Sequence, residues 1–291
     1  MRKILGKKTL GTMMALSLLT ACAGTAYAAK AADYSSTDEY KKSTGLPLIR
    51  AAGAYALGVT GQGITLGITD NFVRLDHQEF RDKAGSYYIY GRPSAGYDWE
   101  SNNHGTHVGG TMVAARNGVG MHGVAFDANI LTDNSFADKV DLAKVYAALN
   151  EMPDVKVINQ SWGHSYYHDE LVQQGFDEPN PPWMEDVAIL KNAIGHDKLL
   201  VFAAGNSGHN SSSVDSGLIA RDYATKNNII LVMAANTNPD RYTTDVDGRV
   251  TGVSEDFLGF FSDLAKYSEE SAITAPGLSV FSSISKDTDA Y

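Results

Sequence analysis

Residues 198–208 read KLLVFAAGNSG, a continuous apolar run that passes into small and polar residues. A second run of the same kind, NIILVMAAN, occupies residues 228–236. Continuous apolar strands are typical of parallel sheets buried on both faces, whereas half-exposed strands alternate apolar and polar residues. The two runs therefore predict central strands of a parallel sheet.

Similar short runs alternate with helical patterns on either side of this stretch. Further strands are predicted at GITLGITD (63–70), ANILTDNSF (128–136) and VKVINQSWG (155–163). Helices are predicted after His104, over residues 138–152 and over residues 183–195. In the second helix the apolar residues share one face: Leu142, Val145, Tyr146 and Leu149. The predicted class is α/β, a buried parallel sheet with helices on both faces.

Polar residues stand where the predicted strands end. Asp70 ends one strand, Asn159 to Ser161 follow a second, and Gly205 to Ser207 follow a third. Ligands of parallel sheets bind beyond the carboxyl ends of the strands, so we expect these residues to meet at one edge. His104 stands in a loop that opens a helix. A carboxylate can fix the tautomer of an imidazole base, and a side-chain amide can donate to an oxyanion. The pattern indicates acyl transfer.

The same segments resemble the subtilisin-like serine proteases, or subtilases. GITLGITD resembles their Asp block, HGTHVGG (104–110) their His block, VFAAGNSG (201–208) their oxyanion block and ITAPG (273–277) the segment ahead of the nucleophile. The order Asp then His is the order of that family. The resemblance extends from about residue 45 to residue 291, nearly all of the chain that comes after the predicted signal.

The resemblance implies a serine-type endopeptidase that acts on polypeptides. It assigns Asp70 to orient the imidazole, His104 as the base and Asn206 as the oxyanion donor. The residues that would line the primary specificity pocket and pair with substrate backbone are Ser161, Trp162, Gly163, Ala203, Ala204 and Gly205.

Some positions depart from the family pattern. Asn71 and Phe72 follow Asp70, where Ser or Thr and then Gly are usual, and Gly109 replaces a usual Ala. No cofactor is expected. Residues 115–128 resemble the region of a family calcium loop, but only Asn117 offers an obvious side-chain oxygen in its tight part, and calcium needs about six oxygens. Residues 165–182 resemble a loop insertion.

The nucleophile motif of subtilases, Gly-Thr-Ser, occurs nowhere in the 291 residues. Ser282, Ser283 and Ser285 follow the ITAPG segment, and none of them is assigned as the nucleophile. We expect a catalytic domain cut before its serine segment, hence incomplete at the C-terminus and inactive as it stands. The alternative is a non-catalytic surface protein that binds peptides in the same cleft.

His104 and His107 raise a second alternative, a metallohydrolase, because histidines one helical turn apart can bind zinc. The chain has no HExxH motif, and spacing places no third ligand. The prediction is therefore that the site holds no metal. A net charge of −10 argues against nucleic acid as a partner, since phosphate binding needs clustered Lys and Arg.

The N-terminus resembles an export signal. A basic start and an apolar run end in small residues, which predicts a signal peptide over residues 1–28. Alternatively LTAC (19–22) resembles a bacterial lipobox, with a signal over residues 1–21 and lipid on Cys22. Either way we expect an extracytoplasmic protein, secreted or at the cell surface or outer membrane.

The expected organisation after the signal is a polar linker over residues 29–44 and a peptidase domain over residues 45–291, present in its N-terminal and central part. Residues 48–70 resemble the start of autotransporter-type subtilases, which implies a longer parent with a C-terminal barrel. Membrane anchoring is then expected through lipid on Cys22 or through that barrel.

Overall fold

A computed structural model supplies the fold of this chain. The residues it describes are 25–89, 91–135, 142–163, 183–206, 208, 228–236, 238, 240, 242–244, 250–253, 262 and 271–291. Cys22, Ser207 and the expected insertion at 165–182 lie outside the described residues.

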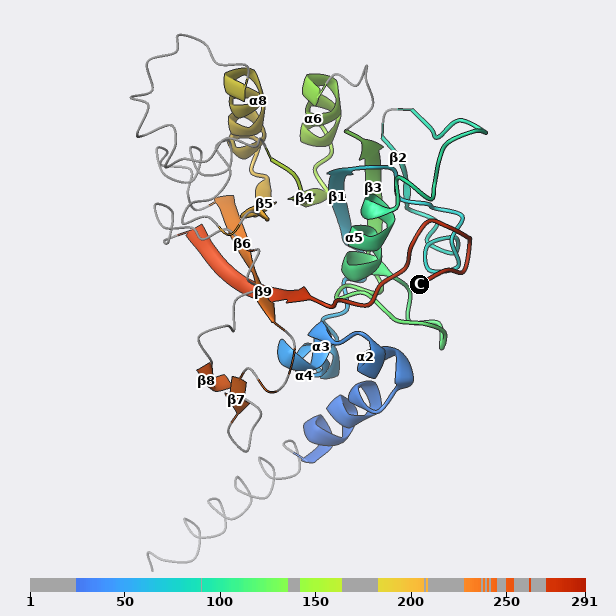
Figure 1. The fold of residues 1–291 in the computed structure, drawn as a ribbon, viewed down its shortest axis with the longest axis vertical. Helices are drawn as coiled ribbons and strands as arrows, with labels where there is room; N and C mark the ends of the chain where they lie inside the picture. Colours follow the sequence, from blue (N-terminus) through green and yellow to red (C-terminus); the bar gives the residue numbers. More distant parts are fainter. Residues whose placement is uncertain are drawn as a thin grey trace, which may run out of the picture.

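The centre of the fold is a seven-stranded sheet in the order β2-β3-β1-β4-β5-β6-β9, and every pair of neighbours is parallel. Figure 1 shows the sheet between its helices. Its strands are β1 (Thr65–Asp70), β2 (Tyr87–Tyr88), β3 (Asn129–Asn134), β4 (Val155–Gln160), β5 (Leu199–Ala203), β6 (Ile229–Asn236) and β9 (Ala272–Leu278). A separate antiparallel pair is formed by β7 (Tyr242–Thr244) and β8 (Val250–Val253).

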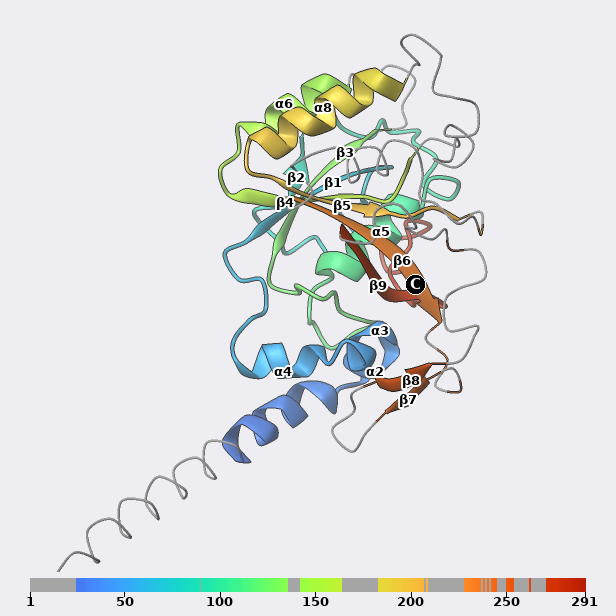
Figure 2. The ribbon, with the colours of Figure 1, turned by 90° about the vertical axis from the view of Figure 1, so that its left-hand side faces the viewer.

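Helices cover both faces of this sheet (Figure 2). One face carries α6 (Leu142–Asn150) and α8 (Trp183–Gly195), and the other carries α5 (His104–Val113). The predicted class, a buried parallel sheet with helices on both faces, is confirmed. The α6 residues Val145, Tyr146 and Leu149 are buried, as the helical spacing predicts.

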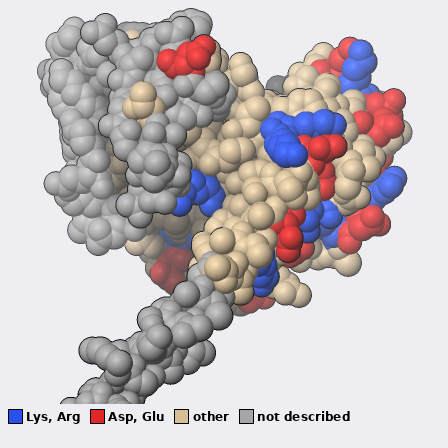
Figure 3. All heavy atoms as spheres, turned by 90° about the horizontal axis from the view of Figure 1, so that it is seen from below, with Lys and Arg blue, Asp and Glu red and all other residues tan. Residues whose placement is uncertain are grey.

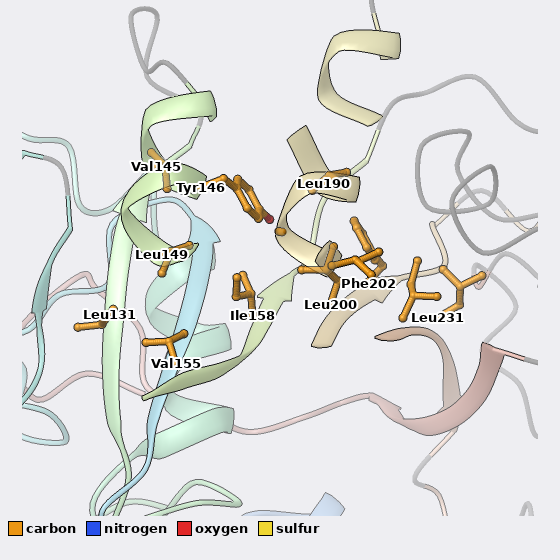
Figure 4. Packing of buried hydrophobic residues seen from close by; sticks show 13 residues of the cluster. Leu131, Val145, Tyr146, Leu149, Val155, Ile158, Leu190, Leu200, Phe202 and Leu231 are labelled. Carbon is orange, nitrogen blue, oxygen red and sulfur yellow. The ribbon is translucent and has the colours of Figure 1, made fainter. Parts of the chain in front are cut away.

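The largest apolar core lies between α6, α8 and strands β3 to β6 (Figure 4). Leu149 and Leu190 of the two helices meet Ile158 and Phe202 of the sheet there. A smaller cluster on the opposite face joins β1 and β3 to α5 and includes Ile68, Ile130 and Val113. Burial of this kind contributes about 1.5–3 kcal/mol for each large apolar side chain, which fixes the sheet between its two layers.

The segment expected as a polar linker differs in this structure, because it is helical and partly buried. A helix spans residues 25–35, and α2 (Asp38–Lys42), α3 (Gly45–Leu48) and α4 (Ala51–Ala56) come after it. Tyr40 is only 4% exposed, and it packs with Tyr55 and Phe126. Aromatic residues spaced among charged ones supply this apolar face, which composition alone conceals.

The surface of the described part mixes charges of both signs. Seen from below, Lys and Arg are interspersed with Asp and Glu (Figure 3). Within the described residues no helix combines the length and the hydropathy that crossing a membrane requires.

Candidate active site

Asp70 occupies the last position of β1, a central strand flanked by β3 and β4. Its side chain is fully buried. The Asn71 amide donates to Asp70 Oδ1 at 2.7 Å, and the Ser135 amide donates to its backbone carbonyl at 2.8 Å. These bonds hold the carboxylate at the carboxyl edge of the sheet, as the strand pattern predicts.

His104 is the first residue of α5, and its ring faces this carboxylate. Nδ1 of His104 lies 2.8 Å from Oδ1 and 3.0 Å from Oδ2 of Asp70. A buried carboxylate accepts, so Nδ1 carries the proton and Nε2 is left with the lone pair. The hydrogen bond to Asp70 raises the pKa of His104 above its ordinary value. The side chain is 54% exposed, so the ring is anchored on one side and open to solvent on the other.

Glycines allow the helix to approach the sheet this closely. A Cβ on Gly105 would lie 2.0 Å from the carbonyl oxygen of Asn71. A Cβ on Gly109 would lie 3.1 Å from the side chain of Val73. The small residues around the histidine therefore have a packing reason, because any side chain at Gly105 would push His104 away from Asp70.

The chain that forms this pair is similar in sequence to known proteins. The sequence model of the subtilase family matches residues 61–290. This chain belongs to the subtilase family. An "Extracellular serine protease" of Serratia marcescens is 29% identical over 298 residues, covering 86% of this chain and 26% of that protein. "Subtilisin DY" of Bacillus licheniformis is 26% identical over 257 residues, covering 84% of this chain and 75% of its own.

Solved subtilase structures share the fold. The subtilisin-like protease Apa1 of the Antarctic psychrotroph Pseudoalteromonas sp. AS-11 gives a TM-score of 0.55 at 20% identity, covering 83% of this chain and 47% of that one. The prenylagaramide maturation protease PagA gives 0.52 at 19% identity, covering 82% of this chain and 70% of that one. The chain spans about a quarter of the length of the Serratia protein.

The other predicted site residues of this subtilase come after β4 and β5. In the register of these parallel strands Gln160 is paired with Phe202, so the segment 161–163 runs beside the segment 203–205. Trp162 Nε1 donates to the Thr69 carbonyl at 2.9 Å, which ties this segment to β1 next to Asp70. Gly205 has φ 126°, and the exposed Asn206 is the next residue. All of these residues stand at the carboxyl edge of the sheet, at the ends of β4, which neighbours β1, and of β5, which neighbours β4.

The two histidines of α5 have different partners. His107 Nε2 donates to the Val280 carbonyl at 3.1 Å, whereas His104 meets Asp70. Burial lowers the pKa of His107, which keeps the ring neutral. In the part of the chain that the structure describes, no three His, Cys, Asp or Glu side chains are grouped to hold a metal ion.

The serines near the C-terminus donate to the helix and to the loop before it. Ser282 Oγ donates to the His107 carbonyl at 2.8 Å, and Ser283 Oγ donates to the Thr106 carbonyl at 3.2 Å. Ser285 Oγ donates to the Trp99 carbonyl at 2.6 Å. All three serines are buried. These hydroxyls support α5 and its preceding loop, and each is engaged by a backbone carbonyl.

Two buried carboxylates meet Asn117, and the sequence reasoning missed them. Glu39 Oε1 accepts from the Asn117 amide at 2.9 Å, and Glu79 Oε2 accepts from Asn117 Nδ2 at 3.3 Å. Burial, aided by the charge of Glu39, raises the pKa of Glu79 to about 7. Oxygen ligands of this type suit a hard cation, yet these three side chains supply fewer oxygens than calcium needs. Glu39 lies in the segment expected as a linker, so composition gave no signal for it.

A buried polar row beside Asp70 also escaped prediction. Asp133, Thr69 and Gln160 are in register across β3, β1 and β4. Both polar side-chain atoms of Gln160 lack a hydrogen-bond partner among the described residues. Burial raises the pKa of Asp133 to about 6. Polar residues at the ends of strands look alike in sequence whether they face the site or the opposite layer.

Proposed function

We propose that this subtilase carries the general-base half of a peptide-hydrolysing site, in which Asp70 orients His104 and His104 takes a proton from the attacking group. The contact that supports the proposal is the 2.8 Å approach of His104 Nδ1 to Oδ1 of the buried Asp70. A carboxylate in this position fixes the tautomer and stabilises the imidazolium that forms during the reaction.

The state of the ring suits this role. Nδ1–H is held by Asp70, so Nε2 is the atom free to accept a proton on the solvent side. The raised pKa of His104 makes the ring a stronger base than a free imidazole. General-base catalysis of this kind contributes about 10²- to 10⁴-fold.

The residues after β4 and β5 would hold the substrate. In this proposal Ser161 to Gly163 and Ala203 to Gly205 form two walls that pair with an extended polypeptide backbone and surround the side chain before the scissile bond. Their parallel register supports the arrangement, because it sets the two segments side by side. Asn206, next on the chain, is proposed to donate its side-chain amide to the oxyanion.

The proposal assigns no nucleophile within residues 1–291, because the Gly-Thr-Ser motif is absent from them. The buried Ser282, Ser283 and Ser285 donate to backbone carbonyls, which supports leaving them out of the catalytic role. The 291 residues alone are therefore expected not to hydrolyse peptides. The proposal therefore leaves the attacking group unassigned among these residues.

We also propose that the protein acts outside the cytoplasm. The basic and apolar N-terminus supports this, as does the extracellular location named for the Serratia relatives. More specifically, we propose that the protein is anchored through lipid on Cys22 or is exported as an autotransporter passenger ahead of a barrel. Labelling with a palmitate analogue, compared between the native chain and Cys22→Ala, distinguishes lipid from simple secretion.

The decisive experiment reads the coding sequence past Tyr291 and expresses the chain together with the continuation encoded there. We expect an in-frame Gly-Thr-Ser and hydrolysis of an unfolded protein substrate. Asp70→Asn should lower kcat by about 10⁴-fold, and Asn206→Ala by about 10²- to 10³-fold. A stop codon directly after Tyr291 would favour the non-catalytic peptide-binding alternative. Unchanged kcat in the Asp70 variant would refute the role of the pair.

A further inference from the structure

A second hollow lies outside the candidate active site, against the edge strand β2. It has a volume of about 630 Å³, and its walls include Arg81, Tyr87, Tyr88, Arg92, Ser94 and Trp99. β2 and β9 are the two edge strands of the sheet, and β2 is hydrogen-bonded to β3 only within that sheet. Tyr87 and Tyr88 of β2 line the hollow, and Figure 1 marks the position of β2 in the fold.

The charges that face this hollow are not balanced. Arg81 and Arg92 are exposed, and no carboxylate within the described ranges forms an ion pair with either. Asp76, the carboxylate in the same wall, forms an ion pair with Arg74, with 3.2 Å between Asp76 Oδ1 and Arg74 Nε. On a chain with a net charge of −10, two arginines without ion-pair partners in one concave surface indicate a site for an anionic group. Guanidinium groups bind carboxylates in a two-pronged geometry, which adds selectivity to the charge.

A wall of aromatic rings joins the hollow to the His104 site. Trp99 lines the hollow, and its ring lies 4.8 Å from Tyr97. Tyr97 lies 5.3 Å from Phe72, which is two residues beyond Asp70. The guanidinium of Arg74 sits 5.4 Å above the Trp99 ring and stiffens the wall.

We propose that this hollow is a secondary binding site for acidic side chains of the polypeptide substrate, held by Arg81 and Arg92 away from the bond presented to His104. The inference rests on the proposed function for the identity of its ligand. It extends that function by naming a substrate class, polypeptides with an acidic segment beside the cleavage point.

The acidic polypeptide is favoured over nucleic acid by the rest of the surface. A nucleic-acid strand needs a continuous row of basic groups, whereas the described surface in Figure 3 mixes both signs and the chain is acidic overall. Two arginines beside Tyr87 and Trp99 suit one or two carboxylates on a chain whose apolar parts contact the rings.

The test measures binding and needs no hydrolysis. A fluorescent peptide with an Asp-Glu pair and its Asn-Gln counterpart are titrated onto the 291-residue chain, and anisotropy gives the two Kd values. We expect the acidic peptide to bind about tenfold more tightly. The double variant Arg81→Gln, Arg92→Gln should reduce this preference to less than about twofold.

The matched control removes the same charge from another surface. Lys41→Gln, Lys42→Gln alters two exposed lysines of α2 and should keep the preference. Equal affinity of the two peptides for the native chain, or an equal loss in the lysine variant, would overturn the proposal. So would stronger competition by an oligonucleotide than by the acidic peptide. Thermal melting shows that each variant is folded. Failure here leaves the Asp70–His104 proposal standing, because that proposal is judged by kcat.

Discussion

Replacing Gly105 by alanine tests how closely the helix of His104 must approach β1. The new Cβ would lie 2.0 Å from the Asn71 carbonyl oxygen, and real Cβ atoms essentially never show a contact under 3.0 Å. The blocking atoms all belong to the backbone of Asn71 and cannot rotate away, so the start of α5 must move by about 1 Å. His104 Nδ1 is 2.8 Å from Asp70, and this displacement takes the pair out of hydrogen-bonding range. Overpacking and the lost bond together cost about 2–4 kcal/mol of folding free energy.

Two measurements on the 291-residue chain check this without any need for activity. Urea denaturation gives the loss of stability, and an NMR titration of the His104 ring should show its pKa falling back toward the ordinary ~6.5. Gly195→Ala is the matched control, because Gly195 ends α8 and a Cβ there meets nothing within 4 Å. That control should be neutral or more stable by up to about 1 kcal/mol. An unchanged His104 pKa in the Gly105 variant would refute the reasoning.

Three further changes have defined outcomes. Burial raises the pKa of Asp133 in the folded chain to about 6, so the native chain loses stability as the pH rises from ~4 through 6. The variant Asp133→Asn should lack this pH dependence of stability. The difference amounts to about 3 kcal/mol, and an unchanged slope in urea titrations at several pH values would contradict it. In Asp70→Asn the stabilisation from a raised His104 pKa should disappear; in the native chain it is fully present below pH ~6.5 and is lost as pH rises through the folded pKa. Equal stability profiles of the two chains would count against it. Trp162→Phe removes the bond to the Thr69 carbonyl and should cost about 1 kcal/mol, seen as a melting temperature lower by about 2–4 °C; an unaltered melting curve would show that the bond contributes nothing.

The sheet could be predicted because each strand is recognisable from its own residues. Runs such as 199–203 and 229–235 are apolar throughout, which is typical of a parallel strand covered on both faces. The order of the strands could not be read in the same way. β1 lies between β3 and β4, and this arrangement depends on which helices cover which face. The helices in the segment expected as a linker were missed because Tyr40 buries its ring from a mainly polar segment.

The candidate site was accessible to sequence reasoning where its residues end strands. Asp70 and His104 meet as expected, since one ends β1 and the other starts the helix packed against it. Glu79 and Asp133 were not anticipated, because their burial depends on partners or layers distant in sequence. Strand register decides whether a polar side chain at a strand end points toward the helix of His104 or toward the layer of α6 and α8. A single sequence does not report that register.

The hydrogen bonds that support α5 come from very late in the chain. His107 is bonded to Val280 and Thr106 to Ser283, across 173 and 177 residues. Contacts this remote form slowly and only after the intervening chain exists. We expect the imidazole of His104 to stay unfixed while the polypeptide is being made, and amide exchange along α5 in a chain ending at residue 278 should be faster than in the 291-residue chain. Such a delay would keep a protein proposed to cut polypeptides harmless to its own unfolded chain until residues 280–283 have been made.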